Sequence, residues 1–303
     1  MATAAIRPTP AHQLSDATVS VTKSDDTNFQ GLPIPRGPVT ATLSFFQPPI
    51  DGSKPYNYVE KQEGDKPQRN FGEDFQNVVI DDLRGKEHQF TLDNNAFGTI
   101  QGVRSEEYDF TDEERIKSVY YPETEKLLLE TVPGAYKVLL FDHTIRRSTP
   151  DANRAPVTRV HIDQTPSSAA QRVRLHLPEE AEKLLKGRYR IINVWRPLNK
   201  GPVMAHPLAV ADSATVDDKD LVPVEHRYPT RTGETAGVRH NENQKWYYWS
   251  GMQNEDRLLL KCFDSDETYG QWGRVPHTAF VDPRTPEGAV GRESIEVRAL
   301  VFG

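Results

Sequence analysis

The sequence predicts a mainly β domain, a barrel or sandwich with helical insertions packed on one side. It contains many short apolar or alternating runs that are typical of strands, and only two segments with helical signals. These elements do not alternate regularly, as they would in a doubly wound nucleotide-binding sheet. The sequence also lacks a G-x-G-x-x-G or Walker-type loop and any repeat of solenoid or propeller period.

The expected domain follows a segment without apolar periodicity. Residues 1–35 are rich in Ala, Thr, Pro, Ser and Asp, and we expect a flexible N-terminal arm there. Residues 36–303 are expected to form a single domain. Its expected strands span residues 39–46, 76–82, 88–93, 136–142, 157–163, 189–195, 207–212, 244–249, 257–263 and 294–302.

Two segments, residues 110–134 and 165–187, carry helical signals. In the first, Thr111 and Glu114 have the spacing of a capping box, and Pro122 is expected to break the helix. In the second, a threonine precedes a proline at the first helical position, and a later proline is expected to split the helix.

Charge and cysteine content exclude several function classes. The 303 residues carry 37 Lys and Arg against 44 Asp and Glu, a formal charge of −7, with no basic stripe. A nucleic-acid or membrane-surface role is therefore not expected. The N-terminus lacks a signal-peptide core, no apolar run has membrane-spanning length, and we expect a cytoplasmic protein. Cys262 is the only cysteine, which excludes an intrachain disulfide and a multi-cysteine zinc site, and its apolar run predicts a buried position.

Two His-x-acid triplets raise the question of a metal site. A histidine and a carboxylate two residues apart lie on the same side of a strand and can bind one metal ion. With nine histidines such triplets also arise by chance, so each could be a solvated strand end. The context favours His161 and Asp163, which end a strand-like run, over His240 and Glu242 in a polar, turn-like stretch. His277, before the last strand, is the best third ligand, because its separation from His161 allows several strands to bring the two together.

The last strand carries candidate anchors for an acidic co-substrate. A 2-oxo acid that chelates iron needs a cation for its far carboxylate, and an arginine fork with a nearby hydroxyl can supply one. Arg292 and Ser294 fit this role, with Arg298 as a further candidate. The alternative is an outward-facing ion pair with Glu293 or Glu296. It applies more to Arg298, which shares a strand face with Glu296.

Substrate-binding candidates are harder to separate from the core. Arg196, at the end of an expected strand, could face a cavity or could stack on Trp195. Tyr121 and Trp246 could line a substrate pocket, although aromatic clusters are more often core.

The sequence resembles the gibberellin desaturase-like, non-haem iron oxygenases of fungal natural-product clusters, which include CmcJ-like proteins. The likeness covers about residues 40–303 and runs through DGSKPYNYV, IDDLRGKEHQFTLDNNAFG, IKSVYYPETEKLL, VLLFDHTIRRS, VHIDQT, INVWRPL, PLAVADSATV, HTAFVDP and RESIEVRALVF. One departure is Ala96, where the family pattern has glycine. The resemblance implies a double-stranded β-helix (jelly-roll, cupin-like) core that uses Fe(II) and 2-oxoglutarate. Carried over by position, it implies iron ligands at His161, Asp163 and His277 and 2-oxoglutarate contacts from Arg292, Ser294 and, as a further candidate, Arg298.

The expected function is an Fe(II)- and 2-oxoglutarate-dependent dioxygenase that oxidises a small natural-product intermediate. The reaction could be hydroxylation, desaturation or ring formation, with dioxygen as the second co-substrate. One alternative is a barrel that binds a metabolite without turnover, as the partner subunit of an oxygenase. Another is a metal-dependent hydrolase or isomerase. Whether the chain forms a homo- or hetero-dimer stays open.

Overall fold

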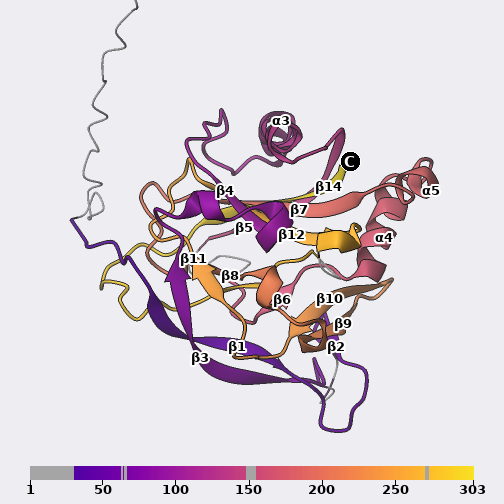
Figure 1. The fold of residues 1–303 in the computed structure, drawn as a ribbon, viewed down its shortest axis with the longest axis horizontal. Helices are drawn as coiled ribbons and strands as arrows, with labels where there is room; N and C mark the ends of the chain where they lie inside the picture. The colour runs from indigo at the N-terminus through magenta and orange to yellow at the C-terminus, as the bar shows by residue number, and fades with distance from the viewer. Residues whose placement is uncertain (1–30, 63, 65–66, 148–154, 270–272) are drawn as a thin grey trace, which may run out of the picture.

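A computed structural model describes residues 31–303, except for residues 63, 65–66, 148–154 and 270–272. Two β-sheets lie one over the other and enclose the core (Figure 1). The prediction of a mainly β fold with helical insertions is confirmed. Most of the expected N-terminal arm lies outside the described residues. In its last described part Ile34 is buried.

The larger sheet has nine strands, and its neighbours are antiparallel except for the β3–β11 and β9–β2 pairs. Two short neighbouring strands near its middle, β13 and β6, carry the histidines of the candidate metal site. In spatial order the strands are β1 (Val39–Gln47), β3 (Gly72–Asp82), β11 (Trp246–Tyr248), β8 (Leu208–Ala211), β13 (His277–Ala279), β6 (His161–Ile162), β10 (Thr232–Val238), β9 (Leu221–Arg227) and β2 (Tyr56–Tyr58).

The smaller sheet has five antiparallel strands, and β14 pairs along its whole length with both neighbours. Side chains along β14 point alternately to the two faces of the sheet, and this puts its polar residues on the inner face. Ile295 and Val297 pack outward against an apolar cluster, while Glu296 and Arg298 point towards the larger sheet. In spatial order the strands are β4 (Phe97–Ile100), β12 (Arg257–Asp264), β7 (Tyr189–Pro197), β14 (Ser294–Phe302) and β5 (Lys137–Arg146).

The main apolar core joins the two sheets. Val210 from the larger sheet packs in one cluster with Leu260, Cys262, Leu300 and Phe302 from the smaller sheet, and all five are fully buried. Burial of each large apolar side chain of this kind stabilises the fold by about 1.5–3 kcal/mol. The core lies beside the polar interior that surrounds the candidate metal site, so it fixes the spacing between the sheets there.

The first helical segment differs from its prediction in two ways. Its N-cap is Asp112, whose side chain accepts from two backbone N–H groups of α2 (Glu113–Arg115), so the expected cap at Thr111 is wrong. Pro122 does not break the helix, because a π-helical turn at residues 116–120 leads directly into α3 (Tyr121–Thr131). Proline lacks a backbone N–H, and at the start of α3 none is needed.

Two further helices, α4 (Pro166–His176) and α5 (Ala181–Leu184), form the second helical segment. Its prediction is confirmed, and Thr165 and Ser168 form a capping box. Figure 1 shows α3 outside the smaller sheet and α4 and α5 together at the right of the view. None of the helices in the described part of the chain is long and apolar enough to cross a membrane.

The expected strand at residues 88–93 is wrong. A 3-10 turn and α1 (Leu92–Asn95) occupy this stretch, and the Thr91 side chain caps the helix by accepting from the Asn94 backbone N–H. Threonine favours strands by propensity, but its side chain can also cap the start of a helix. At Thr91 the capping hydrogen bond is formed, so the chain is helical from Leu92. Ala96 ends the helix in the left-handed region, with φ of 62°, which explains why the family pattern has glycine there.

Candidate metal centre

Two neighbouring short strands bring the three predicted ligands together. His161 is the first residue of β6, Asp163 follows that strand directly, and His277 is the first residue of β13. The strands are antiparallel, with His277 directly opposite His161. Because side chains two residues apart on an extended chain point the same way, Asp163 lies on the same side as His161.

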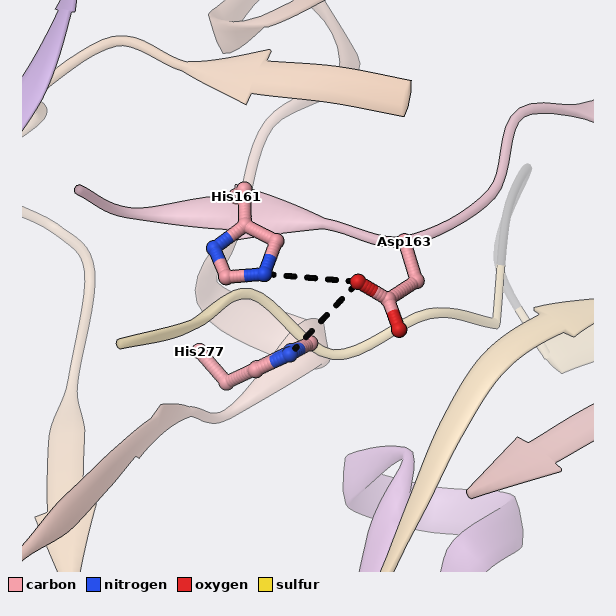
Figure 2. A group of neighbouring side chains, drawn as sticks. All are labelled: His161, Asp163 and His277. Atoms are coloured by element: carbon pink, nitrogen blue, oxygen red, sulfur yellow. Dashed lines mark ion pairs between the residues drawn. The ribbon is translucent and has the colours of Figure 1, made fainter. Parts of the chain in front are cut away.

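The donor atoms converge on one point (Figure 2). The Asp163 Oδ1 atom lies 3.3 Å from His161 Nε2 and 4.0 Å from His277 Nε2. All three donor atoms lie within 4.8 Å of one another. A metal bound to imidazole nitrogen and carboxylate oxygen sits about 2 Å from each donor, so an ion fits among these three. In the described part of the chain, these residues form a group that could hold one.

Hydrogen bonds orient both imidazole rings for metal binding. His161 Nδ1 faces the Arg159 carbonyl oxygen at 2.9 Å, and His277 Nδ1 faces the Val275 carbonyl oxygen at 3.2 Å. A carbonyl oxygen only accepts, so Nδ1 carries the proton in each ring. The Nε2 lone pairs are therefore left for a metal, as in other histidine-ligated sites.

The charge states also suit a metal. Burial would raise the pKa of Asp163, but the Arg298 guanidinium and His161 outweigh it and hold this pKa well below its usual range. Burial, with the neighbouring His161, lowers the pKa of His277 to about 4. At neutral pH the site thus offers an ionised carboxylate and a neutral imidazole, which are the forms that bind metal.

Arg298 holds the second oxygen of Asp163. Its Nε donates to Asp163 Oδ2 over 3.2 Å, and the amide of Asn193 donates to the same oxygen over 2.8 Å. The Arg298 guanidinium also pairs with Glu296 at 2.7 Å and with Asp142 at 3.1 Å. The pair with Glu296 that was weighed as an alternative for Arg298 is present, but it points into the protein rather than outward. The second pair, with the candidate ligand Asp163, was not anticipated from the sequence.

Arg292 and Ser294, at the start of the last strand, are both buried. Arg292 donates from Nη1 to the His206 carbonyl oxygen over 2.8 Å, and its guanidinium lies 5.5 Å from the Trp195 ring centre. Burial, with the nearby charge of Arg146, lowers the pKa of Arg292 to about 10, so it remains a cation at neutral pH. Ser294 is the first residue of β14 and pairs with Arg146 on β5.

The three substrate candidates lie in other surroundings. Arg196 donates through Nε and Nη2 to Asn254, at 3.1 and 2.6 Å, and its guanidinium lies over an aromatic ring. The Tyr121 hydroxyl lies 2.9 Å from His143 Nδ1. Trp246 is buried in the apolar cluster of the larger sheet. The structure does not bring these three side chains together with the metal centre.

A cavity of about 600 Å³ opens beside the metal centre, and His161 and Asp163 form part of its wall. Its other walls come from α4 and from the hairpin of β9 and β10, including His226 and Tyr228. Neither strand of this hairpin was among the expected ones, because residues 233–245, which include most of β10, are polar and turn-like in sequence. His240, the rejected alternative ligand, follows β10 and contacts the Phe45 ring, with 5.0 Å between ring centres.

Comparison with known proteins shows the family of this chain. The YDMC family, described as an oxidoreductase/YMDC permease-like domain, matches residues 43–302. The "Hydroxylase/desaturase poxK" of Penicillium oxalicum is 35% identical over 89% of this chain and 93% of its own length. The "Alpha-ketoglutarate-dependent dioxygenase tstK" of Talaromyces stipitatus is 32% identical over 86% of this chain and 95% of its own. The chain belongs to the fungal family of iron- and 2-oxoglutarate-dependent hydroxylases and desaturases.

Solved structures agree with this family. The iron and α-ketoglutarate-dependent endoperoxidase NvfI superposes with a TM-score of 0.81, at 30% sequence identity, over 89% of this chain and 99% of its own. The jelly-roll-like core expected from the resemblance is thus confirmed at the level of the fold. The triad of His161, Asp163 and His277 lies where two strands of this fold meet.

In this family member, Arg298→Ala is expected to lower the free energy of unfolding of the metal-free protein by about 3–5 kcal/mol. Truncation leaves the carboxylates of Asp163 and Glu296 buried without their shared cation. Urea denaturation measures the loss. Added Mn²⁺ should restore part of it, because a cation bound only by the folded state stabilises that state. Arg298→Lys keeps the charge and should lose less, and an unchanged urea midpoint for Arg298→Ala would contradict the assignment.

Proposed function

We propose that this protein is an Fe(II)- and 2-oxoglutarate-dependent dioxygenase that oxidises a small natural-product intermediate by hydroxylation, desaturation or ring formation. The observation that carries the proposal is the triad of His161, Asp163 and His277, whose imidazoles are oriented by hydrogen bonds and whose His161 and Asp163 line a cavity of about 600 Å³. Two imidazoles and one carboxylate on one face are the donor set of non-haem iron oxygenases. The residues present therefore fit Fe(II).

Iron held at this site would supply the oxidising chemistry, with dioxygen as oxidant and with 2-oxoglutarate converted to succinate and carbon dioxide. The protein's own part is to place the reactants. The two histidines and Asp163 would hold the ion, and its remaining coordination positions would be left to the co-substrates. Arg298 and Asn193 fix the Asp163 carboxylate, so that one of its oxygens stays turned towards the metal.

Arg292 and Ser294 are the proposed anchor for the distal carboxylate of 2-oxoglutarate. Arg292 is a buried cation, and Ser294 lies two residues along the same chain with a hydroxyl that can donate. A guanidinium and a hydroxyl that converge on one carboxylate give charge-assisted hydrogen bonds, which are the stronger kind. Arg298 is already paired with three carboxylates, so bracing Asp163 is the better role for it.

The deciding experiment measures succinate release. Purified protein is supplied with Fe(II), 2-oxoglutarate and dioxygen, and a set of fungal metabolites is screened for compounds that stimulate turnover. A dioxygenase releases one succinate per 2-oxoglutarate consumed and stops without dioxygen. A binding barrel without turnover would release none, and a metal-dependent hydrolase or isomerase would act equally well without dioxygen.

The lone thiol is expected to take no part in this turnover. Cys262 is fully buried on β12, and its Sγ lies 3.7 Å from the Leu260 carbonyl oxygen. Burial, with the nearby Asp163 and Glu296 carboxylates, raises its pKa well above the usual range, so it is a poor nucleophile. Cys262→Ser should keep its turnover, because a hydroxyl can donate to the same carbonyl. Rapid inactivation of the native protein by a thiol reagent, prevented by a substrate, would show the opposite.

A further inference from the structure

The cavity beside the metal centre carries positive charge in a protein whose net charge is −7. Two carboxylates line it, those of Asp163 and Glu234. Asp163 is the candidate ligand, and Glu234 accepts a hydrogen bond from the Thr165 hydroxyl. Against these two acids the cavity wall holds five arginines, which are Arg146, Arg159, Arg172, Arg231 and Arg298.

These arginines fall into two groups. Arg298 is neutralised by its three carboxylate partners, and Arg146 donates to the Ala155 carbonyl oxygen over 2.7 Å. By contrast, Arg159, Arg172 and Arg231 have no carboxylate within ion-pair distance among the described residues. Their charges thus remain available to a ligand in the cavity.

Aromatic rings hold these three guanidinium groups in place. Arg231 lies 3.8 Å from the ring centre of Tyr228, and Arg172 lies 5.3 Å from that of Phe141. Arg159 lies 4.8 Å from the ring centre of Phe71. A stacked guanidinium keeps its N–H edge free for a planar acceptor, so stacking pre-organises an arginine for a carboxylate.

Arg172 and Arg231 come together from different parts of the fold. Arg172 lies on α4, and Arg231 lies in the turn between β9 and β10. Burial lowers the pKa of Arg172, and the charges of Arg231 and Arg298 add to this, although Asp142 opposes them. Like charges that face one cavity repel one another, and a bound anion would relieve that repulsion. The Tyr228 hydroxyl in the same wall could donate a further hydrogen bond.

We propose that the oxidised substrate is an organic acid whose carboxylate is held by Arg172 and Arg231, with the carbon to be oxidised turned towards His161 and Asp163. This inference rests on the proposed function and adds the substrate class to it. The other possible carboxylate in the cavity is the distal one of 2-oxoglutarate. We assign that carboxylate to Arg292 and Ser294, and the experiment separates the two.

The test uses a matched pair of probes, adamantane-1-carboxylate and its neutral isostere adamantane-1-carboxamide. Calorimetry measures their binding to the full chain loaded with Mn²⁺, which replaces iron without turnover, and with 2-oxoglutarate. The carboxylate should bind at least about 10-fold more tightly than the carboxamide. Arg172→Gln and Arg231→Gln should each weaken carboxylate binding roughly 10- to 100-fold and leave carboxamide binding unchanged, since a hydrogen bond to a charged group is lost.

A control variant lies on the same helix. Arg174 is exposed on α4 and pairs with Glu182 at 3.1 Å, away from the cavity wall, so Arg174→Gln should change neither probe. Equal thermal unfolding midpoints would show that all the variants are folded. Equal binding of the two probes by the native protein would overturn the proposal. So would a carboxylate preference that survives in both cavity variants.

A parallel titration separates the substrate from the co-substrate. The visible absorption of the Fe(II)–2-oxoglutarate complex, followed without dioxygen, should give the same 2-oxoglutarate affinity in Arg172→Gln, in Arg231→Gln and in the native protein. Weakened 2-oxoglutarate binding with an unchanged carboxylate preference would assign the arginines to the co-substrate and overturn the proposal. Failure of the proposed function would appear differently, as absent succinate release with the probe preference intact.

Discussion

His161→Ala, Asp163→Ala and His277→Ala are each expected to abolish iron retention and succinate release. Each change removes one of three donors that lie within 4.8 Å of one another. The fold should survive, since Arg298 keeps Glu296 and Asp142 as partners when Asp163 is replaced. Metal analysis after anaerobic loading and desalting measures the iron per chain, and circular dichroism checks the fold.

His240→Ala is the matched control for the triad. This histidine also begins a His-x-acid triplet, but its ring contacts Phe45 rather than the candidate donors. Iron retention and turnover should therefore remain near those of the native protein. Loss of iron in His240→Ala, together with full iron retention in His161→Ala, would contradict the assignment of the iron ligands.

Arg292→Ala is expected to raise the apparent constant for 2-oxoglutarate roughly 30-fold to several thousand-fold. Truncating one partner of a buried, hydrogen-bonded charge pair costs about 2–5 kcal/mol, and about 1.4 kcal/mol corresponds to a factor of ten. Iron retention should stay unchanged, because Arg292 contacts the His206 carbonyl oxygen and Trp195 rather than the triad. The 2-oxoglutarate dependence of succinate release gives the constant.

Arg298→Ala serves as the comparison for this prediction. Its guanidinium contacts Asp163, so the variant should lose iron affinity and change the 2-oxoglutarate constant less than Arg292→Ala does. If Arg292→Ala leaves that constant unchanged while Arg298→Ala raises it strongly at saturating iron, the two roles must be exchanged.

The candidate metal site could be predicted because its geometry is mostly local. His161 and Asp163 need only an extended chain to point the same way, and this holds on β6 and just beyond it. His277 could be chosen because β13 must pair with a strand that is distant in sequence, and it pairs with β6. The ion pairs of Arg298 could not be predicted in full. Alternation placed Glu296 beside it, but Asp163 approaches from the opposite sheet.

The cavity wall could not be predicted because its strands lack the usual pattern. The burial of β9 (Leu221–Arg227) is mostly intermediate, and β10 (Thr232–Val238) contains two glycines and a polar first half. Polar residues on β10 face the cavity, where Glu234 and Thr235 belong to its lining. A strand whose polar side meets a binding cavity shows no clear alternation of core and solvent positions, so it resembles a loop in sequence.

The position of β14 in the smaller sheet has a consequence for the order in which the metal site is assembled. This strand inserts between β7 and β5, which are both made earlier, and it brings Arg298 to Asp163. A nascent chain that has been translated only to residue 276 has two ligands but lacks His277 and the arginine that braces Asp163. Contacts between such distant segments form late, because the long intervening loops must close first. The complete set of ligands, with the Asp163 carboxylate braced by Arg298, is therefore expected only after β14 has docked between β7 and β5.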